Sequence, residues 1–216
     1  MPWRSEIYDE IAHLKARKDS KLEALYNVAA VAFKKHGFRG TSLSDIATAL
    51  GITKAAIYNY VENKQTLAYE LHMLSIEASE EAVSTAMSSG GDALAQLRKL
   101  IEIYVRQIII SPTASFLLID EDALVDEHAR KVAKRRKGIE KSVVKIIESG
   151  IKDGSIAPCD PLLATFVIVG AMQWVPRWFR SDGDWSEEQV AAAVSAVLGR
   201  GLAAEPYPIA QRTADR

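Results

Sequence analysis

One short stretch restricts the fold of this chain more than any other feature, because it has the spacing of a helix-turn-helix. Ala47 precedes Gly51 by four positions, and Ile57 follows that glycine by six. A small residue lets a second helix cross closely, and glycine accepts the positive φ that the tight turn requires. The spacing therefore predicts a first motif helix over 43–50 and a second over 54–61.

Apolar residues recur at helical spacing along the rest of the chain, and no segment alternates with period two over a convincing length. Prolines and glycines gather at the breaks between these segments. Further helices are expected over 20–36, 65–87, 92–110, one or two within 115–153, 161–180 and 186–200. The pattern predicts an all-α fold of about nine helices.

These breaks divide the chain into a head and a body. Residues 1–66 would form an N-terminal arm and a three-helix head with the helix-turn-helix. Residues 67–205 would form a helical body, and 206–216 a flexible tail. Within 11–66 the chain has nine basic and four acidic residues, a net charge of +5 against −6 for the rest. A basic head on an acidic body favours binding to a polyanion.

The composition excludes several classes of protein. Hydrophobic residues make up 48% and charged residues 25%, as in ordinary globular domains. No apolar run approaches the ~20 residues that span a bilayer, and the first residues contain no apolar segment of a secretory signal. The single cysteine, Cys159, cannot form an intramolecular disulfide, which fits a reducing compartment. We therefore expect a cytoplasmic protein without a membrane partner.

The second motif helix leaves small, hydroxyl, amide and basic side chains on its outer face. Small residues let the helix approach base edges, an asparagine can pair with adenine, and lysines meet phosphates. A plain helical hairpin with a solvated face is the alternative. The candidate DNA contacts are Thr41, Ser42, Thr53, Lys54, Ala55, Ala56, Tyr58, Asn59, Tyr60 and Lys64.

The stretch TSLSDIATALGITKAAIYNYVENKQTL resembles the DNA-binding head of the TetR family of transcriptional regulators. The matching positions are Thr41-Ser42, Asp45-Ile46-Ala47, Gly51-Ile52-Thr53, Tyr58-Asn59-Tyr60-Val61 and Lys64. The resemblance implies a homodimer whose second motif helices enter the major grooves of a palindromic operator. It also implies a helical body that binds a small apolar or amphipathic effector and thereby releases the DNA, with no cofactor and no metal.

A second resemblance concerns the segment WVPRWFR at 174–180, which holds two tryptophans and two arginines. With the SDGDWSEEQ that follows, it is similar to a stretch in TetR-type regulators of fatty-acid and steroid-ring breakdown. Several of those sense acyl-CoA thioesters, so the resemblance implies an acyl-CoA or fatty-acid effector. A structural aromatic–arginine cluster at the dimer seam is the alternative. The candidate ligand-binding residues are Tyr104, Ile108, Phe116, Met172, Trp174, Arg177 and Trp178.

Family bodies dimerise through their last two long helices, and the last two helices expected here have apolar faces. Two such helices from each subunit would build a four-helix interface. Packing of these faces inside a single chain is the alternative. The candidate interface residues are Val169, Met172, Val175, Phe179, Val190, Ala193, Val194 and Val197.

Other functions compete with this interpretation. The same body would suit a regulator of a drug or xenobiotic efflux gene that senses a hydrophobic compound. The acidic group at 120–128 makes a metal-dependent enzyme conceivable, but no phosphate loop, dinucleotide fingerprint or nucleophile elbow is present, so we predict no enzyme. A helical adaptor without DNA binding is a third class. The basic run at 131–137 is typical of a solvated helix face, with contact to CoA phosphates as the sharper alternative.

Overall fold

The computed structural model describes residues 21–115 and 124–204. The predicted all-α fold is confirmed, with eight helices in these ranges and a single isolated bridge between Ile156 and Ala203. The helices are α2 (Lys21–Gly40), α3 (Leu43–Leu50), α4 (Lys54–Ile57), α5 (Lys64–Ser88), α6 (Ala93–Ile110), α7 (Asp126–Asp153), α8 (Pro161–Trp178) and α9 (Glu187–Leu202).

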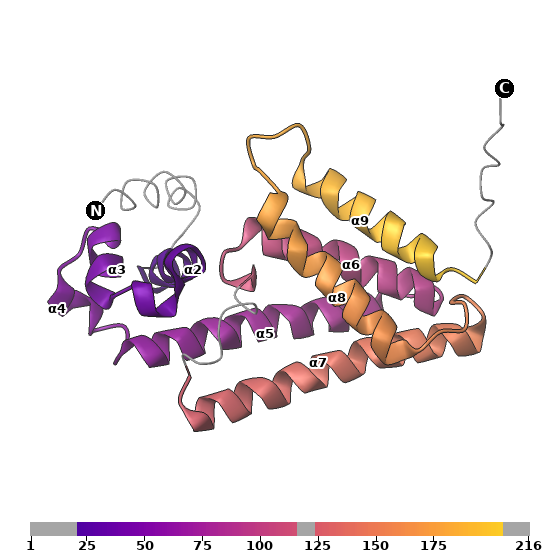
Figure 1. Ribbon diagram of the computed structural model, residues 1–216, viewed down its shortest axis with the longest axis horizontal. Coiled ribbons are helices and arrows are strands. Elements are labelled where there is room, and N and C mark those ends of the chain that lie inside the picture. Colours follow the sequence, from indigo (N-terminus) through magenta and orange to yellow (C-terminus); the bar gives the residue numbers. More distant parts are fainter. Residues whose placement is uncertain (1–20, 116–123, 205–216) are drawn as a thin grey trace.

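The head consists of α2, α3, α4 and the first turns of α5 (Figure 1). Its core is rich in alanine, so the helices approach closely around a few large side chains such as Phe33, Ile46 and Ile57. Gly37 has φ 72° and ψ 164°, so α2 kinks where the predicted helix 20–36 was expected to end. The kink directs the chain from α2 back into the helix-turn-helix.

The helix α5 joins the head to the body without an intervening loop (Figure 1). Its first part contributes Leu67 and Leu71 to the head core, and its second part contributes Ala82 and Ala86 to the body core. The boundary predicted after residue 66 therefore falls inside a continuous helix. The two cores are distinct, but one helix belongs to both.

The body packs α6 against α5, α7, α8 and α9, so that α6 lies at its centre (Figure 1). The approach of α9 to α6 is close because α9 places small residues on that face. A Cβ at Gly199 would lie 2.3 Å from Nε of Arg98, and Ser195 Oγ donates a hydrogen bond to the Arg98 carbonyl oxygen at 3.0 Å. Glycine at 199 therefore makes room for the arginine between the two helices.

Polar caps set the starts of four helices in the body and at its junction with the head. The side chains of Asn63, Asp92 and Asp160 accept hydrogen bonds from the first turns of α5, α6 and α8. Ser186 and Gln189 form a capping box at the start of α9. In the described ranges, no helix has the length and apolar character needed to cross a membrane.

Candidate functional site

The turn between α3 and α4 has the geometry that the sequence predicts. Ser42 caps α3: the Asp45 N–H donates to Ser42 Oγ at 3.2 Å, and the Ser42 hydroxyl donates to Asp45 Oδ2 at 2.7 Å. Gly51 follows α3 with φ 71° and ψ 28°, and its N–H donates to the carbonyl oxygens of Ala47 and Thr48. A left-handed residue at this point turns the chain sharply enough for α4 to cross α3.

The second motif helix is shorter than the predicted 54–61, because α4 ends at Ile57 and a tight turn follows. The N–H groups of Tyr60 and Val61 both donate to the carbonyl oxygen of Ile57. Ile57 and Val61 are buried against the rest of the head. Thr53 caps α4 by accepting from the Ala56 N–H at 3.2 Å.

Polar and small side chains of α4 and its turn face solvent. Thr53, Lys54, Ala55, Tyr58, Asn59 and Tyr60 are exposed, and Ala56 is half-buried. Lys54 and Tyr58 also line a shallow hollow with Ser42 and Ser44 at the start of α3. An ammonium group, hydroxyls and the first turn of a helix together suit a phosphate group.

The side chains of two predicted DNA contacts bind backbone groups of the head: the buried Thr41 side chain cannot reach DNA, whereas Lys64 also lines the hollow beside Lys54. Thr41 is 1% exposed, and its hydroxyl lies within hydrogen-bond distance of the carbonyl oxygens of Ala32 and Gly37. Lys64 Nζ donates to the carbonyl oxygens of Phe38 and Thr41 at 2.8 and 2.9 Å. The same ammonium lies 4.1 Å from the centroid of the Phe38 ring, and burial lowers its pKa. Both side chains hold the α2 kink against α5.

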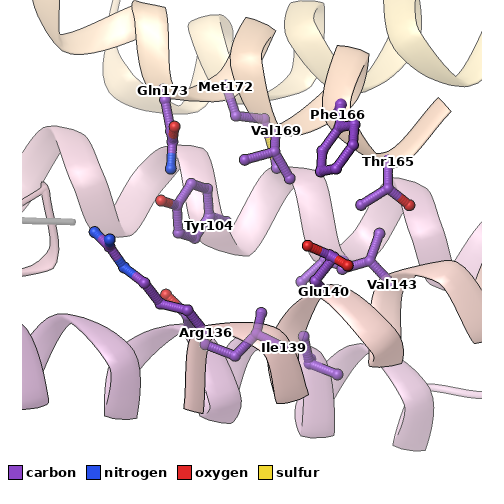
Figure 2. Close-up of a pocket in the computed structure, with 13 residues that line it drawn as sticks. Tyr104, Arg136, Ile139, Glu140, Val143, Thr165, Phe166, Val169, Met172 and Gln173 are labelled. Atoms are coloured by element: carbon purple, nitrogen blue, oxygen red, sulfur yellow. The ribbon is translucent and has the colours of Figure 1, made fainter. Parts of the chain in front are cut away.

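The body contains a cavity of about 290 Å³ between α5, α6, α7 and α8 (Figure 2). Apolar side chains form most of its wall, and a few polar groups interrupt them. The lining residues are Ser79, Val83, Leu100, Tyr104, Arg136, Ile139, Glu140, Val143, Thr165, Phe166, Val169, Met172 and Gln173.

The polar groups of the cavity lie toward two ends. Figure 2 shows Tyr104, Gln173 and Arg136 on one side, and Glu140 and Thr165 on the other. Burial raises the pKa of the Tyr104 phenol, while the neighbouring Gln173 side chain and the charge of Arg136 oppose the rise. Arg136 therefore places a positive charge close to a buried hydroxyl.

Arg136 also acts on a histidine of α5. His72 is fully buried, and its pKa is lowered to about 4 by burial first and by the charge of Arg136 second. The imidazole is therefore neutral at pH 7. The guanidinium of Arg136 thus acts electrostatically on both the cavity hydroxyl and the buried imidazole of α5.

Comparison with known proteins matches both the head and the body. Residues 25–71 match the family model of bacterial regulatory proteins of the tetR family, and residues 90–202 match the tetracyclin repressor-like C-terminal domain. The chain belongs to the TetR family. It is therefore a ligand-responsive transcriptional repressor that binds operator DNA as a homodimer.

Relatives of this TetR-family chain match nearly its whole length. It is 25% identical over 189 residues to the HTH-type transcriptional repressor KstR2 of Rhodococcus jostii (strain RHA1), covering 86% of this chain and 93% of the relative. The crystal structure of the TetR-family regulator PfmR from Thermus thermophilus is 28% identical with a TM-score of 0.73, covering 84% and 98% of the two chains. The structure of AibR in complex with isovaleryl coenzyme A and operator DNA shares the fold at 24% identity and a TM-score of 0.72, covering 82% and 97%.

The cavity of this TetR-family body includes two of the predicted ligand-binding residues, Tyr104 and Met172. Ile108 instead lines a smaller cavity between α2 and the C-terminal ends of α6 and α8. The other described candidates, Trp174, Arg177 and Trp178, lie in the exposed segment at the end of α8 and do not line the cavity. Phe116 lies outside the described residues.

Several cavity residues were not predicted. Arg136 stands within the basic run, where its neighbours Arg135 and Lys137 bind the carboxylates of Glu80 and Glu140. Only its position relative to α6 and α8 distinguishes it. The other unpredicted residues with polar or aromatic side chains are Ser79, Glu140, Thr165, Phe166 and Gln173. The i, i+4 spacing within 136–140 and 165–173 was the available signal, but spacing does not tell which face of a helix meets a cavity.

The predicted dimer helices expose an apolar surface, but on a different face of α8. Met172, Val175 and Val190 are buried within the chain, so their predicted interface role is wrong, and Val169 lines the cavity. Phe179 and Val194 are half-buried, while Ala193 and Val197 are exposed. The exposed large apolar residues of α8 are Leu162, Leu163, Phe166, Val167, Trp174 and Trp178.

The acidic group around the start of α7 does not form a metal site in the described residues, where no cluster of three ligating side chains occurs. Glu127 pairs with Lys131 at 2.7 Å, and the His128 ring stacks on Tyr69 with a centroid distance of 3.9 Å. Residues 120–122 lie outside the described ranges.

Proposed function

We propose that this repressor is released from its operator by an acyl-CoA thioester or a fatty acid. The cavity between α5, α6, α7 and α8 carries this proposal, because an apolar wall with a few polar groups suits an amphipathic ligand. The binding of isovaleryl coenzyme A by AibR, a protein of the same fold, supports this chemical class.

The size of the cavity determines which part of such a ligand enters. An apolar cavity of ~150 Å³ holds one benzene ring, so about 290 Å³ gives room for roughly a dozen non-hydrogen atoms. That is enough for a short or medium acyl group but far too little for coenzyme A. Phe166 lines the cavity and is 54% exposed, so the cavity reaches the surface beside it. The coenzyme A portion would remain outside this opening.

The same cavity suggests how release occurs. One of its walls is α5, and this helix continues into the head core. A ligand that favours one arrangement of α5 therefore favours one placement of the head. Two heads must reach successive major grooves ~34–36 Å apart, so a shifted head population lowers operator affinity.

The DNA-contacting surface is the exposed face of α4 with the start of α3. Thr53, Ala55 and Asn59 would face base edges, while Ser42, Lys54 and Tyr58 would hold phosphates. Ala56 and Tyr60 would lie at the edge of this surface. Binding of operator DNA fits a cytoplasmic location.

The second subunit would cover the outer face of α8 and α9. Leu163, Val167 and Trp174 recur at helical spacing on α8 and are all more than half exposed. Val197 is 67% exposed on α9, with Ala193 one turn before it. A large exposed apolar surface is typical of a homodimer interface, and a two-fold axis would bring these faces together.

Selection of bound sequences from random duplex DNA, followed by fluorescence anisotropy on the selected operator, tests the proposal. Acyl-CoA thioesters of two to twelve carbons, the matching free acids and coenzyme A alone are then titrated in. We expect release by thioesters or free acids of intermediate length and no release by coenzyme A alone. Absence of release across both series would contradict the proposed effector class.

A cavity variant provides a matched control. Val169→Phe would fill part of the cavity, and Val144→Phe adds the same volume on α7 at a half-buried position that does not line the cavity. Release should be weakened for Val169→Phe and retained for Val144→Phe. Equal release by both variants would place the effector elsewhere.

A further inference from the structure

The open side of the body cavity carries an ion pair of α7. Glu140 lines the cavity, and Figure 2 shows its side chain on the same side as Phe166 and Thr165. The Lys137 ammonium, three positions earlier on α7, binds a carboxylate oxygen of Glu140. The Glu140 side chain is 23% exposed and that of Lys137 is 58% exposed, so the pair lies where the cavity passes into solvent. We name these two residues the rim pair.

The two members of the rim pair face different surroundings. Glu140 lines the cavity and Lys137 does not. A ligand inside the cavity therefore meets the carboxylate oxygens before it meets the ammonium. The lysine holds the carboxylate in place from the solvent side, and the charge that faces the ligand is negative.

Thr165 on α8 adds a second hydrogen-bond acceptor on the same side of the cavity. Its side chain is buried, and its hydroxyl donates to the Pro161 carbonyl oxygen at 2.8 Å. Because the single hydroxyl hydrogen is engaged in that bond, Thr165 offers the cavity only the lone pairs of its oxygen. Glu140 and Thr165 both lack a hydrogen to donate, so a ligand group between them must be a donor to form a hydrogen bond.

This arrangement suits an acyl thioester better than a free fatty acid of the same length. A free acid that fills the cavity with its chain places its own carboxylate beside Glu140, and like charges repel strongly in a poorly hydrated site. The thioester group of an acyl-CoA is neutral. Its sulfur is followed, two methylene groups further on, by the first amide N–H of the pantetheine arm, and an N–H that donates to a carboxylate forms a charge-assisted hydrogen bond.

We propose that the rim pair selects acyl thioesters over free fatty acids: Glu140 accepts a hydrogen bond from the first pantetheine amide and repels the carboxylate of a free acid. This inference rests on the proposed function, and it chooses between the two ligand classes named there. Glu140 is the residue that contacts the ligand. Lys137 is a positioning residue, because it acts on the ligand through Glu140.

Three octanoyl ligands without the phosphates of coenzyme A test the rim pair on the full-length homodimer. Octanoyl-N-acetylcysteamine contains the thioester and the amide, its ester analogue has an oxygen atom in place of the amide N–H, and octanoate is the free acid. Calorimetry and operator release are measured for wild type, Glu140→Gln and the matched control Glu148→Gln, which removes an exposed carboxylate of α7 outside the cavity. Circular dichroism and thermal melting report whether each variant is folded.

We expect the wild type to bind the amide thioester roughly 10-fold more tightly than the ester analogue, and to bind octanoate more weakly than either. Glu140→Gln should bind octanoate roughly 10-fold more tightly than the wild type, because the repulsion is removed. Damage to folding or packing does not produce such a gain. Glu148→Gln should match the wild type with all three ligands.

Two results would overturn the rim pair as a specificity site. One is equal affinity of the wild type for the amide thioester and its ester analogue, and the other is unchanged octanoate binding by a folded Glu140→Gln. If Glu140→Gln does not fold, the comparison of amide and ester in the wild type decides alone.

The outcomes also separate this inference from the proposed function, with octanoyl-CoA as a fourth ligand. If octanoate releases the operator as well as the amide thioester does, the acyl effector stands and the rim pair fails. If octanoyl-CoA releases it and none of the three shorter ligands does, recognition lies in the nucleotide portion and the rim pair again fails. If none of the four releases the operator and the longer and shorter acyl-CoA thioesters and acids fail too, both proposals are wrong.

Discussion

The head and the body of this repressor present their functional side chains in opposite directions. In the head, Lys54 and Tyr58 point outward from a core that is already complete. In the body, Tyr104 and Arg136 point inward, into space that four helices leave unfilled. The head therefore functions through side chains that project from its core, and the body through a cavity within its core.

This difference decides how each region tolerates change. A substitution on the outer face of the head alters binding and leaves stability nearly untouched. A substitution in the cavity wall changes packing and ligand binding together, because the same residues serve both. Four experiments, taken in order of decreasing effect, test this distinction.

The largest effect is expected at the outer face of α8, the one place where the body also acts through an outward surface. Val167→Glu would put two carboxylates into the proposed two-fold interface and should weaken dimerisation by about 1,000-fold, since burying an unpaired charge costs several kcal/mol. Sedimentation velocity measures the change. Met87→Glu, at an exposed apolar position on α5, is the control and should stay dimeric. Unchanged dimerisation of Val167→Glu would place the interface elsewhere.

Charge reversal on the head comes next. Lys54→Glu should lower operator affinity by about 100-fold at moderate salt and reduce the slope of log affinity against log salt by about two, one for each subunit. Lys145→Glu makes the same charge change on the exposed face of α7 and should have little effect. Unfolding midpoints of both variants should match the wild type. An unchanged salt slope for Lys54→Glu would show that this lysine meets no phosphate.

The third experiment concerns the loss of stability in acid, which should depend on His72 of α5, next to the head core. The pKa of His72 is lowered to about 4 in the folded chain from 6.5 in the unfolded chain, so the unfolded state binds more protons between these values. Stability should therefore be complete above pH 6.5 and fall as the pH decreases, by about 2.5 kcal/mol at pH 4.5. Denaturant titrations check this loss. His72→Gln should flatten the dependence; a steep slope in His72→Gln would assign the effect to other groups.

The smallest expected effect is a loss of stability that distinguishes Lys64 from Lys54 in the head. Lys64→Met keeps the aliphatic stem but removes the donor that holds Phe38 and Thr41, which should destabilise the head by about 1 kcal/mol. The salt slope of operator binding should stay the same, in contrast to Lys54→Glu. Thermal melting and anisotropy measure the two quantities. A reduced slope with unchanged stability would return Lys64 to the phosphate-contacting surface.

The sequence predicted the head in detail because its determinants are local. Ser42, Gly51 and Thr53 act on backbone groups within a few positions of themselves, so capping and positive φ can be inferred from order alone. The prediction failed for the buried side chain of Thr41 and missed the backbone partners of Lys64, which lie 23 and 26 positions away. Residue type alone does not distinguish a polar side chain that contacts DNA from one that stabilises the DNA-binding surface from within the head.

The body could be predicted only as helices, because the faces of α8 depend on contacts distant in sequence. This helix is apolar on nearly every side, so its pattern contains no signal for which side meets α6, the cavity or a second subunit. Met172 and Val175 turned inward, while Val167 and Trp174 remained outside. Arg136 could not be separated from its basic neighbours before α6, α7 and α8 were placed together.

Because α5 is continuous, the orientation of the head relative to the body depends on the phase of one helix. Because each residue of an α-helix turns the chain by about 100° and advances it by ~1.5 Å, inserting or deleting one residue between Leu71 and Ala82 would rotate the whole head about the helix axis. A chimaera that joins this head to another body must therefore be spliced within the helix and in register. Heads can therefore be exchanged only between proteins whose connecting helices have the same length.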